Sequence, residues 1–181
     1  MSKKEQLLVI AEDMVRSGGY NSVSFRTLAE SAGIKSASVH YHFPTKADLG
    51  AALAERYTEN FLSSLGAPNA LLASGKNPID VFISLFRYAL SVDKKMCLCG
   101  MLGAEFDGLP EKVRIATRIF FKKNIEWLTH AFQTVSSRDE QEARKAATSL
   151  IAQLEGALLI SIALEDEAIF ETAIKNRSNT Q

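Results

Sequence analysis

The sequence predicts an all-α protein of about nine helices, and three observations lead to that prediction. Apolar residues recur at intervals of three and four along most of the 181-residue chain, which is the spacing of one helix face. Glycine and proline fall at the ends of these periodic segments, where helices start and stop. No segment alternates between apolar and polar residues as a half-buried strand would.

The first three helices are expected to be short and close together. Residues 3–17 form an amphipathic segment that a pair of glycines ends. Ser24 is a suitable N-cap for a second helix, which Gly33 ends. A third helix begins at once and stops before Pro44, because the residue preceding a proline disfavours helical geometry. Two helices of about eight residues therefore flank a short turn.

Longer helices are expected along the rest of the chain. Thr45 is a suitable cap for the first of them, and Gly66-Ala67-Pro68 breaks it before a short helical stretch that ends near Gly75. Prolines suit the first turns of two later helices. The expected segments are 46–65, 78–91, 95–106, 110–134, 138–164 and 165–175, followed by a polar tail at 176–181.

The composition describes a protein with substantial cores and no overall charge. Apolar residues make up 46% of the chain, and 21 basic residues balance 21 acidic ones. Zero net charge argues against a protein that coats nucleic acid indiscriminately, because such binding needs many cationic side chains. A local site remains open, since residues 31–47 contain no carboxylate. No uninterrupted apolar run is long enough to cross a membrane and no signal segment follows the N-terminal lysines, so a cytoplasmic protein is expected.

Residues 24–46 read SFRTLAESAGIKSASVHYHFPTK and have the physical features of a helix-turn-helix. The small Ala29 lets two helices cross closely, and Gly33 permits the turn between them. Val39 and Phe43 anchor the third helix. The side chains that then project outward are Ala37, Ser38, His40 and Tyr41. Small, polar and aromatic groups on a short helix suit the reading of a DNA major groove. The alternative is an ordinary helical hairpin with a solvated face.

The string from Gly33-Ile34-Lys35 through His42-Phe43-Pro44-Thr45-Lys46-Ala47-Asp48-Leu49 resembles the signature of the TetR family of transcriptional repressors, over about residues 5–55. The resemblance implies a DNA-binding domain at 1–48, and a ligand-binding and dimerisation domain at 49–181. It implies a homodimer on pseudo-palindromic operator DNA that a small-molecule ligand releases. The residues it places at the DNA, together with those that project outward, are Ser24, Arg26, Lys35, Ser36, Ala37, Ser38, His40, Tyr41, His42 and Lys46. Tyr41, His42 and Lys46 resemble anchors to the DNA backbone.

One C-terminal segment is apolar almost all round. One stripe contains Ala143, Ala147, Leu150, Leu154 and Ala157, and another contains Ala146, Ile151, Leu158 and Ile162. A helix with one solvent-exposed face needs only one apolar stripe. We therefore expect one stripe to be buried in its own domain and the other against a second copy of the chain, with Gly156, Ala157 and Ser161 allowing close approach. The family resemblance likewise implies a homodimer through the last two helices.

Aromatic residues and a few polar ones in the C-terminal part are candidates for the lining of an effector cavity, and a plain hydrophobic core is the alternative. The predicted ligand-binding residues are Phe61, Phe82, Phe86, Met101, Glu105, Phe121, Trp127 and Gln153. Such a lining predicts an apolar or amphipathic small-molecule effector.

The sequence does not favour metal binding or catalysis. Cys97 and Cys99 are too few for a zinc site, and two histidines spaced as His40 and His42 lie on nearly opposite faces of a helix. Only His130 remains for a catalytic role, so we expect no metal, no cofactor and no enzymatic activity. The cysteines are either small buried hydrophobes or thiols that sense electrophiles or oxidants. A thiol-sensing repressor of the same fold and a helical protein-interaction module therefore stay open as alternatives.

Overall fold

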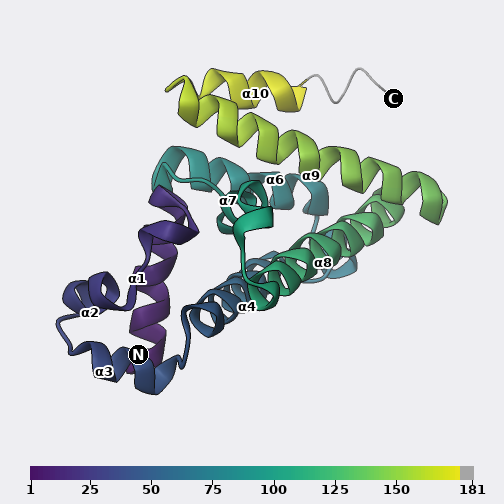
Figure 1. Ribbon diagram of the computed structural model, residues 1–181. Coiled ribbons are helices and arrows are strands. Elements are labelled where there is room, and N and C mark those ends of the chain that lie inside the picture. Colours follow the sequence, from purple (N-terminus) through teal and green to yellow (C-terminus); the bar gives the residue numbers. More distant parts are fainter. Residues whose placement is uncertain (176–181) are drawn as a thin grey trace. The chain divides into compact units, whose positions relative to one another are not determined.

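The computed structural model describes residues 1–175, and every regular element in that range is helical (Figure 1). The all-α prediction is confirmed. The α-helices are α1 Lys3–Gly18, α2 Phe25–Ala32, α3 Ser36–His42, α4 Lys46–Leu65, α5 Pro68–Ala73, α6 Pro78–Tyr88, α7 Leu98–Ala104, α8 Glu111–Val135, α9 Glu140–Ala163 and α10 Ala168–Lys175. Three shorter helical turns complete the list: η1 Tyr20–Ser22, η2 Ala89–Asp93 and η3 Phe106–Gly108.

Local sequence explains where the N-terminal helices begin and end. The Ser2 hydroxyl accepts the N–H of Glu5 at 3.1 Å and starts α1. Ser24 starts α2 in a capping box, in which the Thr27 N–H donates to the Ser24 hydroxyl and the Ser24 N–H donates to the Thr27 hydroxyl. Gly33 ends α2 in the left-handed region with a φ of 64°. α2 and α3 are therefore joined by the turn that the sequence predicts.

Helix α4 has the bounds that the sequence predicts, whereas α6, α7 and α10 are shorter than expected. α6 ends at Tyr88 and α7 begins only at Leu98. Between them, η2 is a π-helical turn that ends at Lys94, whose φ is 52°. The N–H groups of Lys94 and Lys95 both return to the carbonyl of Ala89, and this closure stops the helix before it can continue towards α7.

The chain divides into two compact units that do not follow the sequence order. The first unit contains residues 1–60 and 98–121, and the second contains residues 61–97 and the chain from Lys122 onward. Helix α4 runs without a break through the predicted domain boundary at 48/49. The division into a DNA-binding part before this boundary and a ligand-binding part after it stays a prediction.

Each unit has its own apolar core. The first core contains buried side chains from α1, α2, α3, α4, α7 and α8, including Leu7, Leu28, Val39, Leu49, Leu53, Leu102, Val113 and Phe120. The second contains Phe82, Phe86, Leu128, Leu150, Leu154, Leu158 and Phe170. Within the first unit, Asp48 pairs with Lys112 and the Tyr57 ring contacts the Phe120 ring, so α4 and the beginning of α8 run side by side in the same direction.

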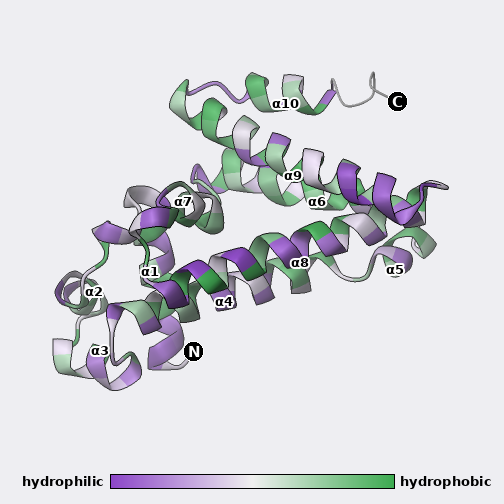
Figure 2. Ribbon diagram, turned by 45° about the vertical axis from the view of Figure 1, so that its right-hand side comes forward, coloured by the Kyte–Doolittle hydropathy of each residue, from purple (hydrophilic) through white to green (hydrophobic). Residues whose placement is uncertain are grey.

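Helix α9 leaves an apolar stripe uncovered in the single chain. Both stripes predicted from the sequence contain residues that are buried in the single chain, including Leu154 of the first stripe and Ile151 and Leu158 of the second, and α9 contacts both α6 and α10. The expected division, with one of these stripes buried in its own domain and the other against a partner, is therefore wrong. The exposed apolar residues are Ala152, Leu159, Ile160 and Ala163. Figure 2 shows that α9 is hydrophilic in its first turns and hydrophobic towards its C-terminal end.

By length and composition α9 could cross a membrane, and among residues 1–175 it is the one helix that meets this criterion. Polar residues interrupt the apolar ones in α9, so the helix contains no long uninterrupted apolar run. A core helix of a water-soluble protein meets the same criterion, and 39% of the apolar window of α9 is buried within the chain.

Candidate nucleic-acid interface

Helix α3 presents the outward face that the sequence predicts. Val39 and Phe43 are buried against the first unit and hold the helix in place. Ala37, Ser38 and Tyr41 are exposed, and the Tyr41 side chain is 85% accessible. A short helix whose base is fixed and whose outer face carries small and aromatic side chains can enter a major groove without moving its support.

His40 and His42 have different surroundings. The His40 ring packs edge-on against Phe25 of α2, with ring centroids 4.5 Å apart, although His40 remains exposed. His42 is half-buried and lies against the Tyr41 ring. The two histidines are thus supported by different neighbours. In residues 1–175 no group of three or more His, Cys, Asp or Glu side chains could hold a metal ion.

A shallow hollow runs along the exposed face of α3. Its lining consists of Lys3, Ile34, Ala37, Ser38, Tyr41 and His42. Lys3 was not among the residues predicted at this face, because it begins α1 and lies more than thirty residues from α3 in the chain. The two adjacent lysines at the N-terminus, Lys3 and Lys4, were the sequence feature that could have indicated this position. Lys4 also lies near this helix, with Nζ 5.7 Å from the Phe43 ring centroid.

The remaining predicted DNA-binding residues surround α3. Arg26 is exposed on α2 and pairs with Glu30 at 3.5 Å. Lys35 is exposed at the N-cap of α3, and Ser36 is half-buried in its first turn. Ser24 is exposed, but its hydroxyl is engaged in the capping box of α2. Cationic side chains thus lie at the N-terminal ends of α1, α2 and α3, where free backbone N–H groups also favour phosphate.

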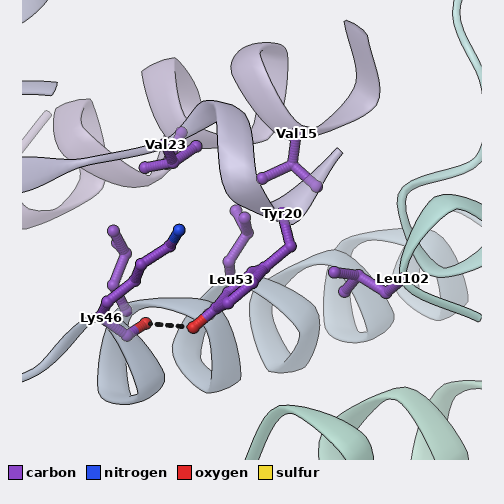
Figure 3. Close-up of a pocket in the computed structure, with 9 residues that line it drawn as sticks. Val15, Tyr20, Val23, Lys46, Leu53 and Leu102 are labelled. Carbon is purple, nitrogen blue, oxygen red and sulfur yellow. Dashed lines mark hydrogen bonds between the residues drawn. The ribbon is translucent and has the colours of Figure 1, made fainter. Parts of the chain in front are cut away.

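Lys46 is directed toward Tyr20. Its Nζ lies 4.4 Å from the Tyr20 ring centroid, and the Tyr20 hydroxyl donates to the Lys46 carbonyl at 3.1 Å (Figure 3). Burial lowers the pKa of the Lys46 amine, and the negative charge of Glu105 opposes part of that shift. Both side chains line a small apolar cavity of about 10 Å³ together with Leu53 and Leu102. Lys46 therefore has a well-defined position at the start of α4, next to the end of α3.

The predicted ligand-binding residues are distributed over both units. Four rings of the second unit contact one another, with Phe82 at the centre: its ring centroid lies 5.3 Å from that of Phe61, 5.8 Å from Phe86 and 5.7 Å from Trp127. Trp127 also donates from Nε1 to the Gly66 carbonyl at 2.8 Å. This cluster joins α4, α6 and α8 within the second unit.

The other four candidates do not join that ring cluster. Gln153, in the second unit, donates from Nε2 to the Ala173 carbonyl at 2.6 Å and so holds α10 against α9. Met101, Glu105 and Phe121 belong to the first unit. Phe121 packs edge-on against Phe120, and the Glu105 carboxylate accepts the Tyr20 N–H at 2.7 Å.

The two cysteines are buried in α7 and immediately before it. Cys97 belongs to the second unit and neighbours Glu155 of α9. Burial raises the pKa of the Glu155 carboxyl to about 7, and the Cys97 thiol opposes part of that shift. A buried thiol beside a carboxyl group is poorly placed to form a thiolate, because both burial and a nearby negative charge disfavour the anion.

Comparison with known proteins agrees with this geometry. Residues 4–53 match the family described as bacterial regulatory proteins of the tetR family, and residues 79–176 match the C-terminal domain of LmrA/YxaF-like transcriptional regulators. A TetR transcriptional regulator from Legionella pneumophila is 30% identical, with a TM-score of 0.89 over 99% of this chain and 97% of that one.

Two further solved structures are similar over nearly their whole length. A TetR-family regulator from Agrobacterium tumefaciens is 26% identical, with a TM-score of 0.82 over 97% of this chain and 95% of that one. The reduced form of NemR from E. coli is 24% identical, with a TM-score of 0.83 over 98% and 96% of the two chains. The similarity to NemR concerns the fold alone.

Proposed function

The chain belongs to the TetR family of transcriptional regulators. We propose that it is a cytoplasmic repressor that binds operator DNA and that a small-molecule ligand releases it from the operator. Regulators of this family bind DNA through a helix-turn-helix and are not enzymes. The observation that carries the proposal is the exposed face of α3, with Ala37, Ser38 and Tyr41 outward and Val39 buried beneath them. Direct readout of base edges needs such a face.

The homodimer is supported by the uncovered stripe of α9. Leu159 and Ile160 are 51% and 45% exposed, and their neighbours on the stripe are small. A second copy of the chain is the occupant that the family suggests, and self-association of the same stripe gives a two-fold axis. Two copies of α3 related by that axis require a pseudo-palindromic operator, with half-sites about one helical turn, roughly 34 Å, or somewhat more apart.

Selection of a duplex from random-sequence DNA by the full-length protein provides the probe that tests the DNA face. Lys35→Ala is expected to weaken binding to every duplex alike and to reduce the salt dependence by about one ion per half-site, because Lys35 is an exposed cation at the start of α3. Ser38→Asn is expected to change the preferred sequence while leaving the salt dependence unchanged, since it adds no charge.

Lys76→Ala is the matched control, because Lys76 is exposed in the second unit and its replacement removes the same charge. Equal titrations for Lys35→Ala and Lys76→Ala in a mobility-shift assay would show that the DNA face is wrongly assigned. Absence of salt-dependent binding by the wild-type protein would favour the alternative of a helical interaction module.

An apolar or amphipathic effector is supported by the ring cluster around Phe82, since such molecules bind among aromatic side chains. The rings contact one another in this structure, so a ligand that binds there must displace at least one of them. Thermal-shift screening of hydrophobic compounds, followed by a mobility-shift assay with each hit, tests this class. Coupling between the two sites is expected to weaken DNA binding by about 1 to 3 kcal/mol.

Thiol sensing is the second candidate mechanism for release. It draws on the presence of two cysteines in and beside α7, but their burial and the carboxyl of Glu155 beside Cys97 argue against a reactive thiolate. The ligand-binding mechanism therefore has the better support.

A further inference from the structure

Glu105 connects two segments that are distant in the sequence. It follows the last residue of α7, and its Oε2 accepts the N–H of Tyr20 at 2.7 Å across 85 positions of the chain. Gly19 makes this approach possible. Its φ is 78°, and a Cβ at that position would overlap Oε1 of Glu105. The carboxylate is thus seated directly on the backbone between α1 and η1.

Tyr20 links Glu105 to the segment between α3 and α4. Its side chain is buried, and its hydroxyl donates to the carbonyl of Lys46, the first residue of α4. The Lys46 amine lies over the Tyr20 ring (Figure 3). Three residues separate Lys46 from His42, where α3 ends. A shift of Tyr20 would therefore move the junction between α3 and α4.

A second tether fixes the same junction. Lys112, in the first turn of α8, donates to Oδ1 of Asp48 at 2.6 Å, and the hydrogen bonds from Lys112 and Thr45 lower the pKa of the Asp48 carboxyl. A Cβ on Gly50 would meet both Tyr20 and Val113, so the start of α4 is closely packed between those residues. Residues 98–121 thus hold the start of α4 at two points.

We propose that Glu105 is a positioning residue for DNA binding: it fixes Tyr20, and Tyr20 in turn fixes Lys46 where its amine can reach a backbone phosphate of the operator. The proposal rests on the DNA-binding function proposed above. It assigns to residues 98–121, outside the helix-turn-helix in sequence, a direct part in setting operator affinity. Glu105 itself does not touch the DNA.

The experiment compares Glu105→Ala, Glu105→Gln and Lys46→Ala on the selected duplex over a range of salt concentrations. Glu105→Ala is expected to weaken binding at least about tenfold, because Tyr20 loses an acceptor. Glu105→Gln should stay within about threefold of wild type, since the amide oxygen can accept the same N–H. The salt slope of Glu105→Ala should fall by about one ion per half-site, as it does in Lys46→Ala.

The double variant makes the test specific to positioning. In the Glu105→Ala background, Lys46→Ala should cause no further loss of salt slope, because the amine no longer reaches its phosphate. Asp107→Ala, an exposed carboxylate two residues away, is the matched control and should bind like wild type. Circular dichroism and thermal unfolding verify that each variant is folded at the assay temperature.

Two results would overturn the proposal. One is a Glu105→Ala titration equal to that of Asp107→Ala. The other is weaker binding by Glu105→Ala with an unchanged salt slope and a full additional effect of Lys46→Ala, which would mean a general structural role. Failure of the wild-type protein to bind any selected duplex would instead contradict the proposed function, so the two failures are distinguishable.

Discussion

Arg56 of α4 donates from Nη1 to Oε2 of Glu12 in α1 at 2.7 Å. The same guanidinium donates from Nε to Glu5 at 2.6 Å, so one side chain joins two turns of α1 to α4 within the first unit. Arg56 is only 17% exposed and Glu12 20% exposed. Removing one partner of an ion pair that is shielded from solvent lowers the stability of the fold, because the other charge is left buried without a partner. Replacing both partners by apolar residues costs less stability.

Arg56→Ala is therefore expected to lower the free energy of unfolding by about 2 kcal/mol. Urea unfolding followed by circular dichroism at constant protein concentration measures the change. Arg26→Ala is the control: its pair with Glu30 is 83% and 66% exposed and should contribute less than about 0.5 kcal/mol. Equal effects of the two substitutions would show that Arg56 does not hold α1 against α4.

The buried Glu155 carboxyl predicts a pH-dependent stability. Its pKa is raised from 4.5 to about 7, so between these values the folded chain holds a proton that the unfolded chain has lost. The contribution of Glu155 to the free energy of unfolding is therefore most favourable below pH 4.5, falls as the pH rises to 7, and stays low above pH 7. The free energy of unfolding of Glu155→Gln, relative to that of wild type, should therefore rise by about 3 kcal/mol as the pH is raised from 4.5 to 8.

Urea unfolding across this pH range, followed by the fluorescence of the single Trp127, tests the prediction. Glu126→Gln removes an exposed carboxylate of the second unit and should give a curve parallel to wild type. A Glu155→Gln curve that is also parallel to wild type would mean that Glu155 titrates normally in the folded protein.

The bounds of α4 and the outward face of α3 could be predicted because their causes are local. Thr45 and Asp48 cap each other within one turn, and Gly66 follows the last residue of α4. The face of α3 follows from Val39 and Phe43, which are one helical turn apart. These features depend on residues that are close together in the chain.

The role of Glu105 could not be predicted, because it depends on a contact across 85 positions. A carboxylate among apolar residues suits either a ligand or a backbone N–H, and only packing decides between them. The same limit applies to α9. Its periodicity reveals two apolar stripes, but which residues remain exposed depends on where α6 and α10 pack, and the uncovered residues include Leu159 and Ile160.

Leu159→Asp is expected to dissociate the proposed homodimer, because an aspartate on the uncovered stripe of α9 would have to enter an apolar interface without a partner. Sedimentation equilibrium at micromolar concentration should show twice the 19.9 kDa chain mass for wild type and the single-chain mass for the variant. Leu72→Asp in α5, where the leucine is 43% exposed, should remain dimeric. A wild-type protein that sediments at 19.9 kDa would contradict the dimer itself.

The reactivity of the two cysteines distinguishes ligand binding from thiol sensing as the release mechanism. Cys97 and Cys99 are both buried, and the Cys97 thiol adjoins the carboxyl of Glu155. A thiol reacts with a disulfide reagent as its thiolate and must be reached by the reagent, so both thiols should be protected in the folded protein. Reaction with dithiobis(nitrobenzoic acid) should be at least about 100-fold slower for the native chain than for the urea-unfolded chain. Ser137→Cys places a thiol at an exposed position and should add one rapidly reacting group, which verifies the assay. Rapid reaction of a native cysteine, with loss of DNA binding that Cys97→Ser or Cys99→Ser prevents, would instead identify the protein as a thiol sensor.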